Sequence, residues 1–127
     1  VGGICGYRIR GEARVGARTA LTYVTTGVLL RQLEADPALS CATHVVVDEV
    51  HERTVDTDLL LLVLRRLVQS PKGSVKLVLM SATIDTAPFV GYFGGGGGDS
   101  PAVGVIDIPG RTFPVSEYYL ERAIADA

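Results

Sequence analysis

The sequence has few features that would place it in an extracellular or membrane class. Cysteine is scarce: Cys5 and Cys41 lie far apart and form no Cys-x-x-Cys pair. This spacing favours free thiols in a reducing compartment, with one disulfide as the alternative. There is also no recognisable signal peptide and no apolar run long enough to span a bilayer. We therefore expect an intracellular protein, in the cytoplasm or the nucleus, with no membrane partner.

A basic excess is missing as well. The chain has 12 lysine and arginine residues and 14 acidic residues, for a net charge of −2. No global positive field indicates a nucleic acid partner, although a local basic patch remains compatible with one. The hydrophobic fraction of 47% excludes a wholly disordered chain, and 127 residues suit one domain with a core.

A phosphate-binding loop of the form Gly-x-x-x-x-Gly-Lys-Ser/Thr is absent from this sequence, and neither Lys72 nor Lys76 follows a glycine. Residues 94–98 are all glycine, but no predicted strand leads straight into them, which argues against a phosphate cradle. We expect a flexible surface loop over 94–100 instead. The chain begins at Val1 rather than at methionine, and we expect it to be a fragment.

The most informative stretch is an apolar strand that runs into two acids. Val45 to Val47 are β-branched, and Asp48 and Glu49 follow directly. Such a run predicts a strand over 45–48 that is buried on both faces, as in parallel sheets. Ligands of open α/β sheets bind beyond the carboxyl ends of the strands, where these acids lie. Because adjacent side chains leave an extended backbone in different directions, one acid can face a metal and the other a water, as hydrolysis of a magnesium nucleotide requires. The alternative is a strand that merely ends in an acidic loop.

A second strand delivers small hydroxyl residues to the same edge. Residues 58–68 predict a buried helix, capped by Asp56 or Thr57, and residues 75–80 predict another buried strand. Strand, helix and strand form a right-handed crossover with parallel strands. Ser81-Ala82-Thr83 should therefore lie beside the acids in an α/β fold with a mainly parallel sheet.

The remaining pattern predicts shorter elements on either side of this unit. Threonine or aspartate caps and proline positions set the ends of the predicted helices. The predicted elements are a strand over 4–9 broken by Gly6, a loop or hairpin tip over 11–18, a strand over 19–25, a helix from Thr25 or Thr26 to Asp36-Pro37, a helix from Asp85 or Thr86 to Phe93, a strand over 103–108, and a strand or fraying helix over 116–127.

Taken as a set and in this order, these segments resemble the DEAH-box RNA helicases of superfamily 2. The resemblance covers nearly the whole chain. Asp48-Glu49-Val50-His51-Glu52-Arg53 resembles motif II of this family, Ser81-Ala82-Thr83 resembles motif III, Thr25-Thr26-Gly27-Val28-Leu29-Leu30-Arg31 resembles motif Ib with Thr26 where aspartate is usual, and Gly6 to Glu12 and Ile108 to Val115 resemble two further family segments.

The resemblance implies roles for individual residues. Asp48 would hold Mg²⁺ through water, and Glu49 would orient and deprotonate the water that attacks ATP. His51 would link the nucleotide site to a second RecA-like domain. Each role has a structural alternative, because His51 could be a core or capping histidine and Arg53 could simply pair with Glu52 or Asp56. The resemblance also gives Ser81 and Thr83 a role in coupling nucleotide state to strand movement, and Arg10 and Thr25 a role in contacting the RNA backbone, although alone they would be a loop charge and a helix cap.

The resemblance further implies a domain organisation. Residues 1–115 would be the C-terminal part of a RecA-like domain of the P-loop NTPase type, with three α/β/α layers, and 116–127 would lead to the second RecA-like domain. The phosphate-binding loop would lie upstream, so we expect this fragment alone to be inactive. Two alternatives stay open: a degenerate RecA-like module that binds RNA or protein without hydrolysing ATP, and a DNA helicase of the same superfamily.

Overall fold

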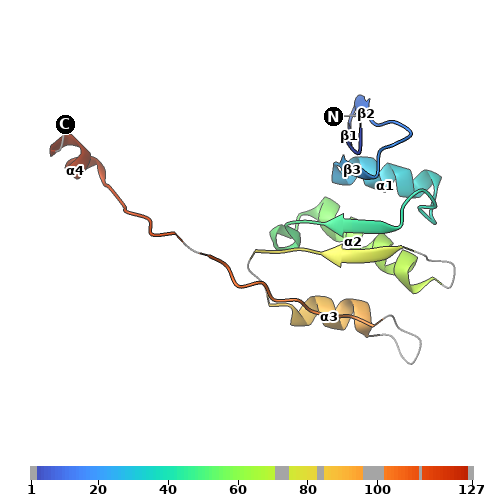
Figure 1. Ribbon diagram of the computed structural model, residues 1–127. Coiled ribbons are helices and arrows are strands. Elements are labelled where there is room, and N and C mark those ends of the chain that lie inside the picture. The colour runs from blue at the N-terminus through green and yellow to red at the C-terminus, as the bar shows by residue number, and fades with distance from the viewer. Residues whose placement is uncertain (1–2, 71–74, 83–84, 96–101, 112, 126–127) are drawn as a thin grey trace.

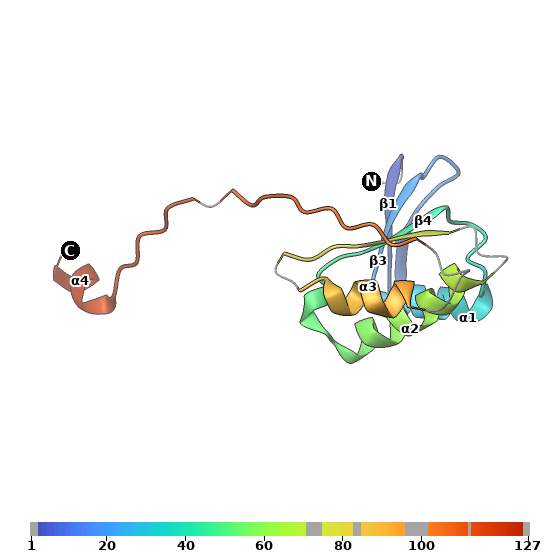
Figure 2. The same cartoon turned by 90° about the horizontal axis from the view of Figure 1, so that it is seen from below.

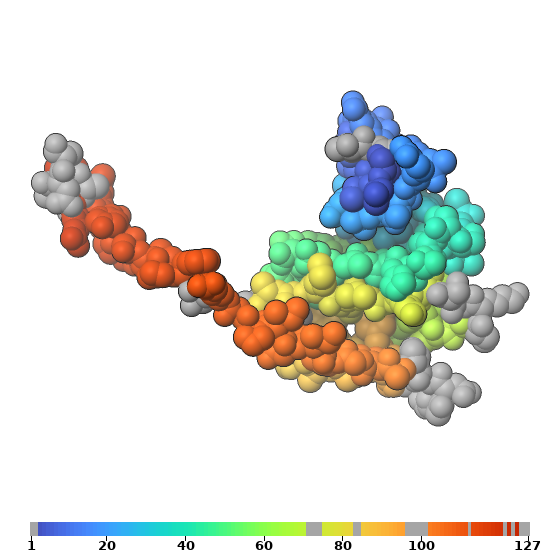
Figure 3. All heavy atoms as spheres, in the orientation of Figure 1, coloured from blue at the N-terminus to red at the C-terminus, as the bar shows by residue number. Residues whose placement is uncertain are grey.

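The structure is a computed structural model that describes residues 3–70, 75–82, 85–95, 102–111 and 113–125. Figure 1 shows an α/β body and a C-terminal segment that extends away from it. The space-filling view shows the same segment as a narrow arm (Figure 3). None of the helices in the described residues is long and apolar enough to cross a membrane.

The body is built around one strand–helix–strand unit. Strand β4 (His44–Val47) leads through a short loop to helix α2 (Val55–Gln69), and the chain returns in β5 (Lys76–Leu79). The two strands are parallel, with Val45 opposite Leu77. The predicted crossover is confirmed. Strand β4 begins and ends one residue earlier than predicted, and β5 is one residue shorter than predicted at each end.

Helix α2 begins earlier than the sequence predicted. Thr54 is its N-cap, with an extended backbone, and its hydroxyl accepts a hydrogen bond from the Thr57 backbone N–H at 3.2 Å. The predicted caps, Asp56 and Thr57, are therefore wrong, and both lie in the first turn. Asp56 and Asp58 place negative charge there, where the helix dipole favours it.

Only one face of the β4–β5 pair is covered. Val45 and Val47 are buried, whereas Val46 between them is 53% exposed. Val78 and Met80 on and beside β5 are exposed as well. Figure 2 shows α1, α2 and α3 on one side of these strands. The expectation of a strand buried on both faces is wrong for the described residues, because none of their elements packs on the second face. They supply the sheet and one helical layer of the predicted partial RecA-like α/β fold.

Helix α2 contributes four of the twelve buried hydrophobic residues of the core in the described part of the chain. Leu60, Leu61, Leu64 and Leu67 are buried against the sheet. The helix is less enclosed than its apolar sequence predicted, since Leu59 and Leu62 on its other side are exposed. The partners of the leucines in the core are Leu29, Leu33, Leu39, Val45, Val47, Val50, Val75 and Phe93.

The N-terminal part forms a small separate sheet. Strand β1 (Cys5–Ile9) pairs antiparallel with β2 (Glu12–Arg14) and parallel with β3 (Leu21–Val24). Gly6 lies inside β1 rather than breaking it. A Cβ atom at Gly6 would lie 2.4 Å from the Arg14 carbonyl oxygen, so only glycine fits this close approach.

Two further helices begin at the predicted caps. Helix α1 (Thr26–Ala35) follows Thr25 directly, and helix α3 (Ala87–Gly94) follows Thr86. The Asp85 carboxylate accepts a hydrogen bond from the Ala87 backbone N–H at 3.0 Å. Asp85 and Thr86 therefore share the start of α3.

The C-terminal segment differs from prediction. Residues 102–111 are irregular, so the strand predicted over 103–108 is wrong for this structure, in which no described strand pairs with it. Helix α4 (Leu120–Ala125) agrees with the helical option for 116–127. Of the predicted glycine loop, 96–100 lies outside the described residues.

Candidate functional site

The loop after β4 carries the predicted acids in an unusual backbone conformation. The strand ends at Val47, one residue earlier than predicted. Glu49 has φ 53° and ψ 37°, a short helical turn η1 spans Val50–Glu52, and Arg53 has φ 49° and ψ 39°. A left-handed backbone at a residue other than glycine is strained and tends to occur at functional sites. The chain therefore turns at Glu49, directly after Asp48, and the extended backbone assumed from the sequence is wrong.

This loop is fixed to the end of β5. The side chain of Val50 is 2% exposed, and its backbone N–H donates to the carbonyl of Met80 at 3.2 Å. The N–H of Met80 donates in turn to the carbonyl of Val47 at 2.8 Å. These two hydrogen bonds hold the ends of β4 and β5 together where their loops begin.

Side chains of the two loops also meet. The Ser81 hydroxyl and His51 Nδ1 are 3.0 Å apart, and both residues are half-buried. The prediction that the two loops share one edge of the sheet is confirmed by this contact. Thr83, the other predicted coupling residue, lies outside the described residues. We call Asp48, Glu49, His51 and Ser81 the acidic rim.

His51 Nδ1 contacts both an acid and a hydroxyl. It lies 3.3 Å from Glu49 Oε2, in addition to its contact with Ser81. Because this nitrogen carries at most one hydrogen, the two oxygen atoms share or compete for it. His51 thus connects the predicted catalytic acid to the second loop through a single atom.

The carboxylates on this rim can be tested against a magnesium ion. Asp48 and Glu49 are exposed, and Asp48 Oδ1 accepts a hydrogen bond from the Glu49 backbone N–H at 2.8 Å. Mg²⁺ commonly binds through one or two carboxylates together with waters and nucleotide phosphates. No group of three or more ligating side chains occurs within the described part of the chain. The donor set fits an ion held through Asp48 and a bound nucleotide, and it does not form an all-protein cage.

Two predicted RNA-binding residues lie at the ends of neighbouring strands. Arg8 of β1 is opposite Val24 of β3 in the parallel register, so Arg10 and Thr25 both follow the carboxyl ends of their strands. Both residues are exposed. Thr25 is the N-cap of α1, yet its side chain makes no capping hydrogen bond. The Thr25 hydroxyl therefore does not cap the helix, although helix capping was the structural alternative to contact with RNA.

One ion pair at the end of the loop was not predicted. Arg53 Nε lies 2.8 Å from Asp58 Oδ1, and a second guanidinium nitrogen lies 3.0 Å from Asp58 Oδ2. The expected partners, Glu52 and Asp56, are wrong. Hydrogen bonds from Arg53 lower the pKa of the Asp58 carboxyl below its ordinary value and raise the pKa of Arg53. In the sequence, Arg53 precedes Asp58 by five residues, and this spacing was a possible signal of the ion pair. The pair also requires the left-handed turn at Arg53, which brings the two side chains together.

The fold and the acidic rim define a partial RecA-like α/β domain. The chain is 46% identical to ATP-dependent RNA helicase dhx29 of Xenopus laevis over 121 residues, which are 95% of this chain and 8% of that protein. It is 44% identical to human ATP-dependent RNA helicase DHX29, covering 97% of this chain and 8% of that protein. No family model matches the chain.

A solved structure gives the same result. The DEAH/RHA helicase HrpB of Escherichia coli aligns with 70% of this chain at a TM-score of 0.65 and 42% identity, and the match covers 11% of HrpB. The chain is homologous to DEAH-box ATP-dependent RNA helicases, which confirms the family predicted from its motifs. It spans about 8% of the length of the two curated relatives named here.

Proposed function

We propose that this chain is part of the first motor domain of a DEAH-box ATP-dependent RNA helicase. In this proposal, hydrolysis of Mg-ATP at the acidic rim is coupled to the binding and unwinding of RNA. The observation that carries the proposal is the 3.0 Å contact of Ser81 with His51, beside the two acids. Homology to proteins named ATP-dependent RNA helicases supports it. The activity would belong to the longer protein, with a second RecA-like domain facing the rim.

Hydrolysis would use the two acids in different ways. Asp48 would hold Mg²⁺ through water, and the ion would neutralise charge on the nucleotide phosphates. Glu49 would accept a proton from the attacking water at its carboxylate and orient that water. The nearby His51 Nδ1, 3.3 Å from Glu49 Oε2, can hold the carboxylate in place by sharing its hydrogen.

Coupling would run through the contact between the two loops. His51 contacts both Glu49 and Ser81, so a movement of the Glu49 carboxylate would be transmitted to the loop that follows β5. Ser81 and Thr83 would pass this change towards the RNA, and His51 would contact the second RecA-like domain.

RNA would be held by its backbone. Arg10 and Thr25 follow neighbouring strand ends, and an arginine and a hydroxyl suit phosphate oxygens. Phosphate contacts position a strand without reading its sequence. We therefore expect binding that is largely independent of RNA sequence and weakens with salt.

The substitution Glu49→Gln in the full-length protein tests this function. We expect ATP hydrolysis to be abolished while ATP binding is retained, because the amide keeps the length of the side chain but cannot accept the proton. The matched control is Glu52→Gln, an exposed acid of the same loop, which should leave turnover unchanged. Unchanged hydrolysis in Glu49→Gln would refute the role of Glu49.

A non-catalytic RecA-like module is the second candidate, because no Gly-Lys-Ser/Thr loop occurs within these residues. Steady-state ATP hydrolysis by the full-length wild-type protein separates the two functions. Strand displacement on matched RNA and DNA duplexes then decides the substrate.

A further inference from the structure

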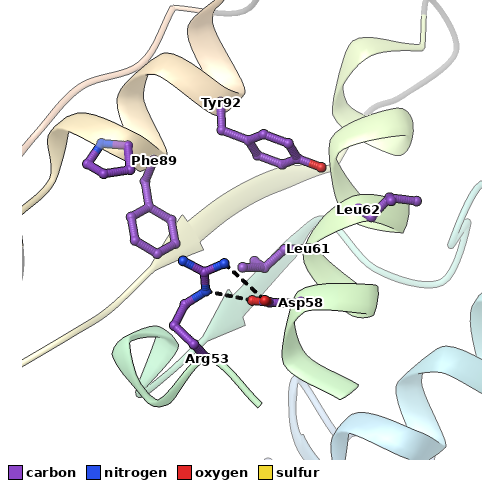
Figure 4. Close-up of a pocket in the computed structure, with 7 residues that line it drawn as sticks. Arg53, Asp58, Leu61, Leu62, Phe89 and Tyr92 are labelled. Atoms are coloured by element: carbon purple, nitrogen blue, oxygen red, sulfur yellow. Dashed lines mark hydrogen bonds and ion pairs between the residues drawn. The ribbon is translucent and has the colours of Figure 1, made fainter. Parts of the chain in front are cut away.

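The ion pair between Arg53 and Asp58 closes the loop that carries the acidic rim. Two nitrogens of the guanidinium reach the two carboxylate oxygens, at 2.8 and 3.0 Å (Figure 4). This bidentate arrangement fixes the orientation of the arginine as well as its position. Asp58 belongs to the first turn of α2, which is anchored in the core by Leu60, Leu61, Leu64 and Leu67. The end of the loop is thus tied to a rigid element.

The same loop has a left-handed residue at each end of its helical turn. Glu49 is the N-cap of η1 and Arg53 is its C-cap, and both have positive φ. Conformations of this kind persist only where the surroundings enforce them. At the Glu49 end, the described contacts include the Val50 hydrogen bond to Met80, the Glu49 N–H bond to Asp48 Oδ1 and the His51 contacts. At the Arg53 end, the side-chain contact found in the described residues is the pair with Asp58.

The pair lies at one end of a groove between α2 and α3. Figure 4 shows the Arg53 guanidinium next to Asp58 and facing the Phe89 ring. The rest of the groove is apolar and is lined by Leu61, Leu62, Pro88, Phe89 and Tyr92. Both partners of the ion pair are partly exposed, and such pairs contribute little to global stability. A role in local geometry fits these facts better than a role in stability.

We propose that Arg53 is a positioning residue for hydrolysis, acting through Asp58 to hold the loop that presents Glu49. This inference rests on the proposed function. When the pair is broken, Arg53 can leave its left-handed conformation, and the turn that orients Glu49 relaxes. A displacement of about 1 Å in a catalytic group can lower turnover by roughly 100-fold. Nucleotide affinity should change little, because neither member of the pair belongs to the acidic rim.

Four variants of the full-length protein test this inference. Arg53→Gln and Asp58→Asn each break the pair and should lower kcat for ATP about 10- to 100-fold, with KM for ATP within about twofold of wild type. The exchanged pair, Arg53→Asp with Asp58→Arg, rebuilds the contact and should regain most of the loss. Aspartate is well suited to position 53, because it tolerates a positive φ. The control is Arg66→Gln, an exposed arginine on the same helix, which should behave as wild type.

The outcomes separate this inference from the proposed function. If Glu49→Gln abolishes hydrolysis while Arg53→Gln and Asp58→Asn keep wild-type kcat, the positioning role of Arg53 is overturned and the function stands. If hydrolysis survives in Glu49→Gln, the proposed function fails. If the single variants melt at a lower temperature than wild type, the exchanged pair separates stability from positioning. An exchanged pair with restored melting temperature but low kcat contradicts the positioning role, and one with restored kcat supports it.

Discussion

Removal of the Ser81 hydroxyl should separate ATP hydrolysis from unwinding. Ser81→Ala deletes the 3.0 Å contact with His51, which is a side-chain link between the two loops. A typical hydrogen bond contributes about 0.5–1.5 kcal/mol net, so the linked arrangement should lose roughly 2- to 12-fold in population. Both side chains are half-buried, so we do not expect the larger cost of a fully buried unpaired group. Hydrolysis should persist, because neither acid is altered.

The assay measures ATP hydrolysis and RNA strand displacement on the same preparation of full-length protein. Displacement per ATP hydrolysed should fall in Ser81→Ala. The matched control is Ser40→Ala, which removes a serine hydroxyl bonded to Asp36 at 2.6 Å in another loop, and its ratio should equal that of wild type. A double-mutant cycle with His51→Gln isolates the pair. Strictly additive effects of Ser81→Ala and His51→Gln would refute the coupling role of this contact.

Two further predictions concern stability. Leu64→Ala removes a side chain that is 0% exposed on α2 and should lower the free energy of unfolding by about 2–5 kcal/mol. The control Leu62→Ala lies on the exposed side of the helix and should lower this free energy far less. Chemical denaturation of the domain measures both values. The lowered pKa of Asp58 means that its pair with Arg53 favours the folded state above the ordinary aspartate value of 3.8 and that this contribution is lost as the pH falls through the lower, folded pKa. Asp58→Asn should remove this part of the acid dependence in denaturation curves measured across that range, and an unchanged acid profile in the variant would contradict the assignment.

The central unit could be predicted because its signals are local and agree with one another. A β-branched run, a leucine-rich helix and a second apolar run leave few topologies once right-handed crossover is required. The placement of the loops that carry His51 and Ser81 at one edge of the sheet then follows from the parallel strands. The side-chain partner of each residue within the loops did not follow, because the left-handed turns at Glu49 and Arg53 have no sequence signal at residues of this type.

Two predictions failed because they depended on which neighbouring elements pack on a strand or pair with it. An apolar run such as Val45 to Val47 does not reveal whether a helix covers one face or two, and Val46 is exposed here. The strand predicted over 103–108 has apolar residues of the right kind, but a strand forms only with a partner to bond to. The start of α2 was misplaced for a local reason, since Thr54 and Thr57 are equally suited to capping and only the backbone of Thr54 is extended.

The positive φ of Glu49 limits which substitutions at this position can be interpreted chemically. Glutamine has the same shape as glutamate and a similar backbone preference, so it changes the carboxylate and little else. Valine or isoleucine would meet a steric penalty in the left-handed region before any chemistry was altered. Glycine would relieve the strain but release the turn. A survey of all residues at position 49 would therefore report backbone tolerance as much as proton transfer, and only the glutamate-to-glutamine comparison isolates the acid.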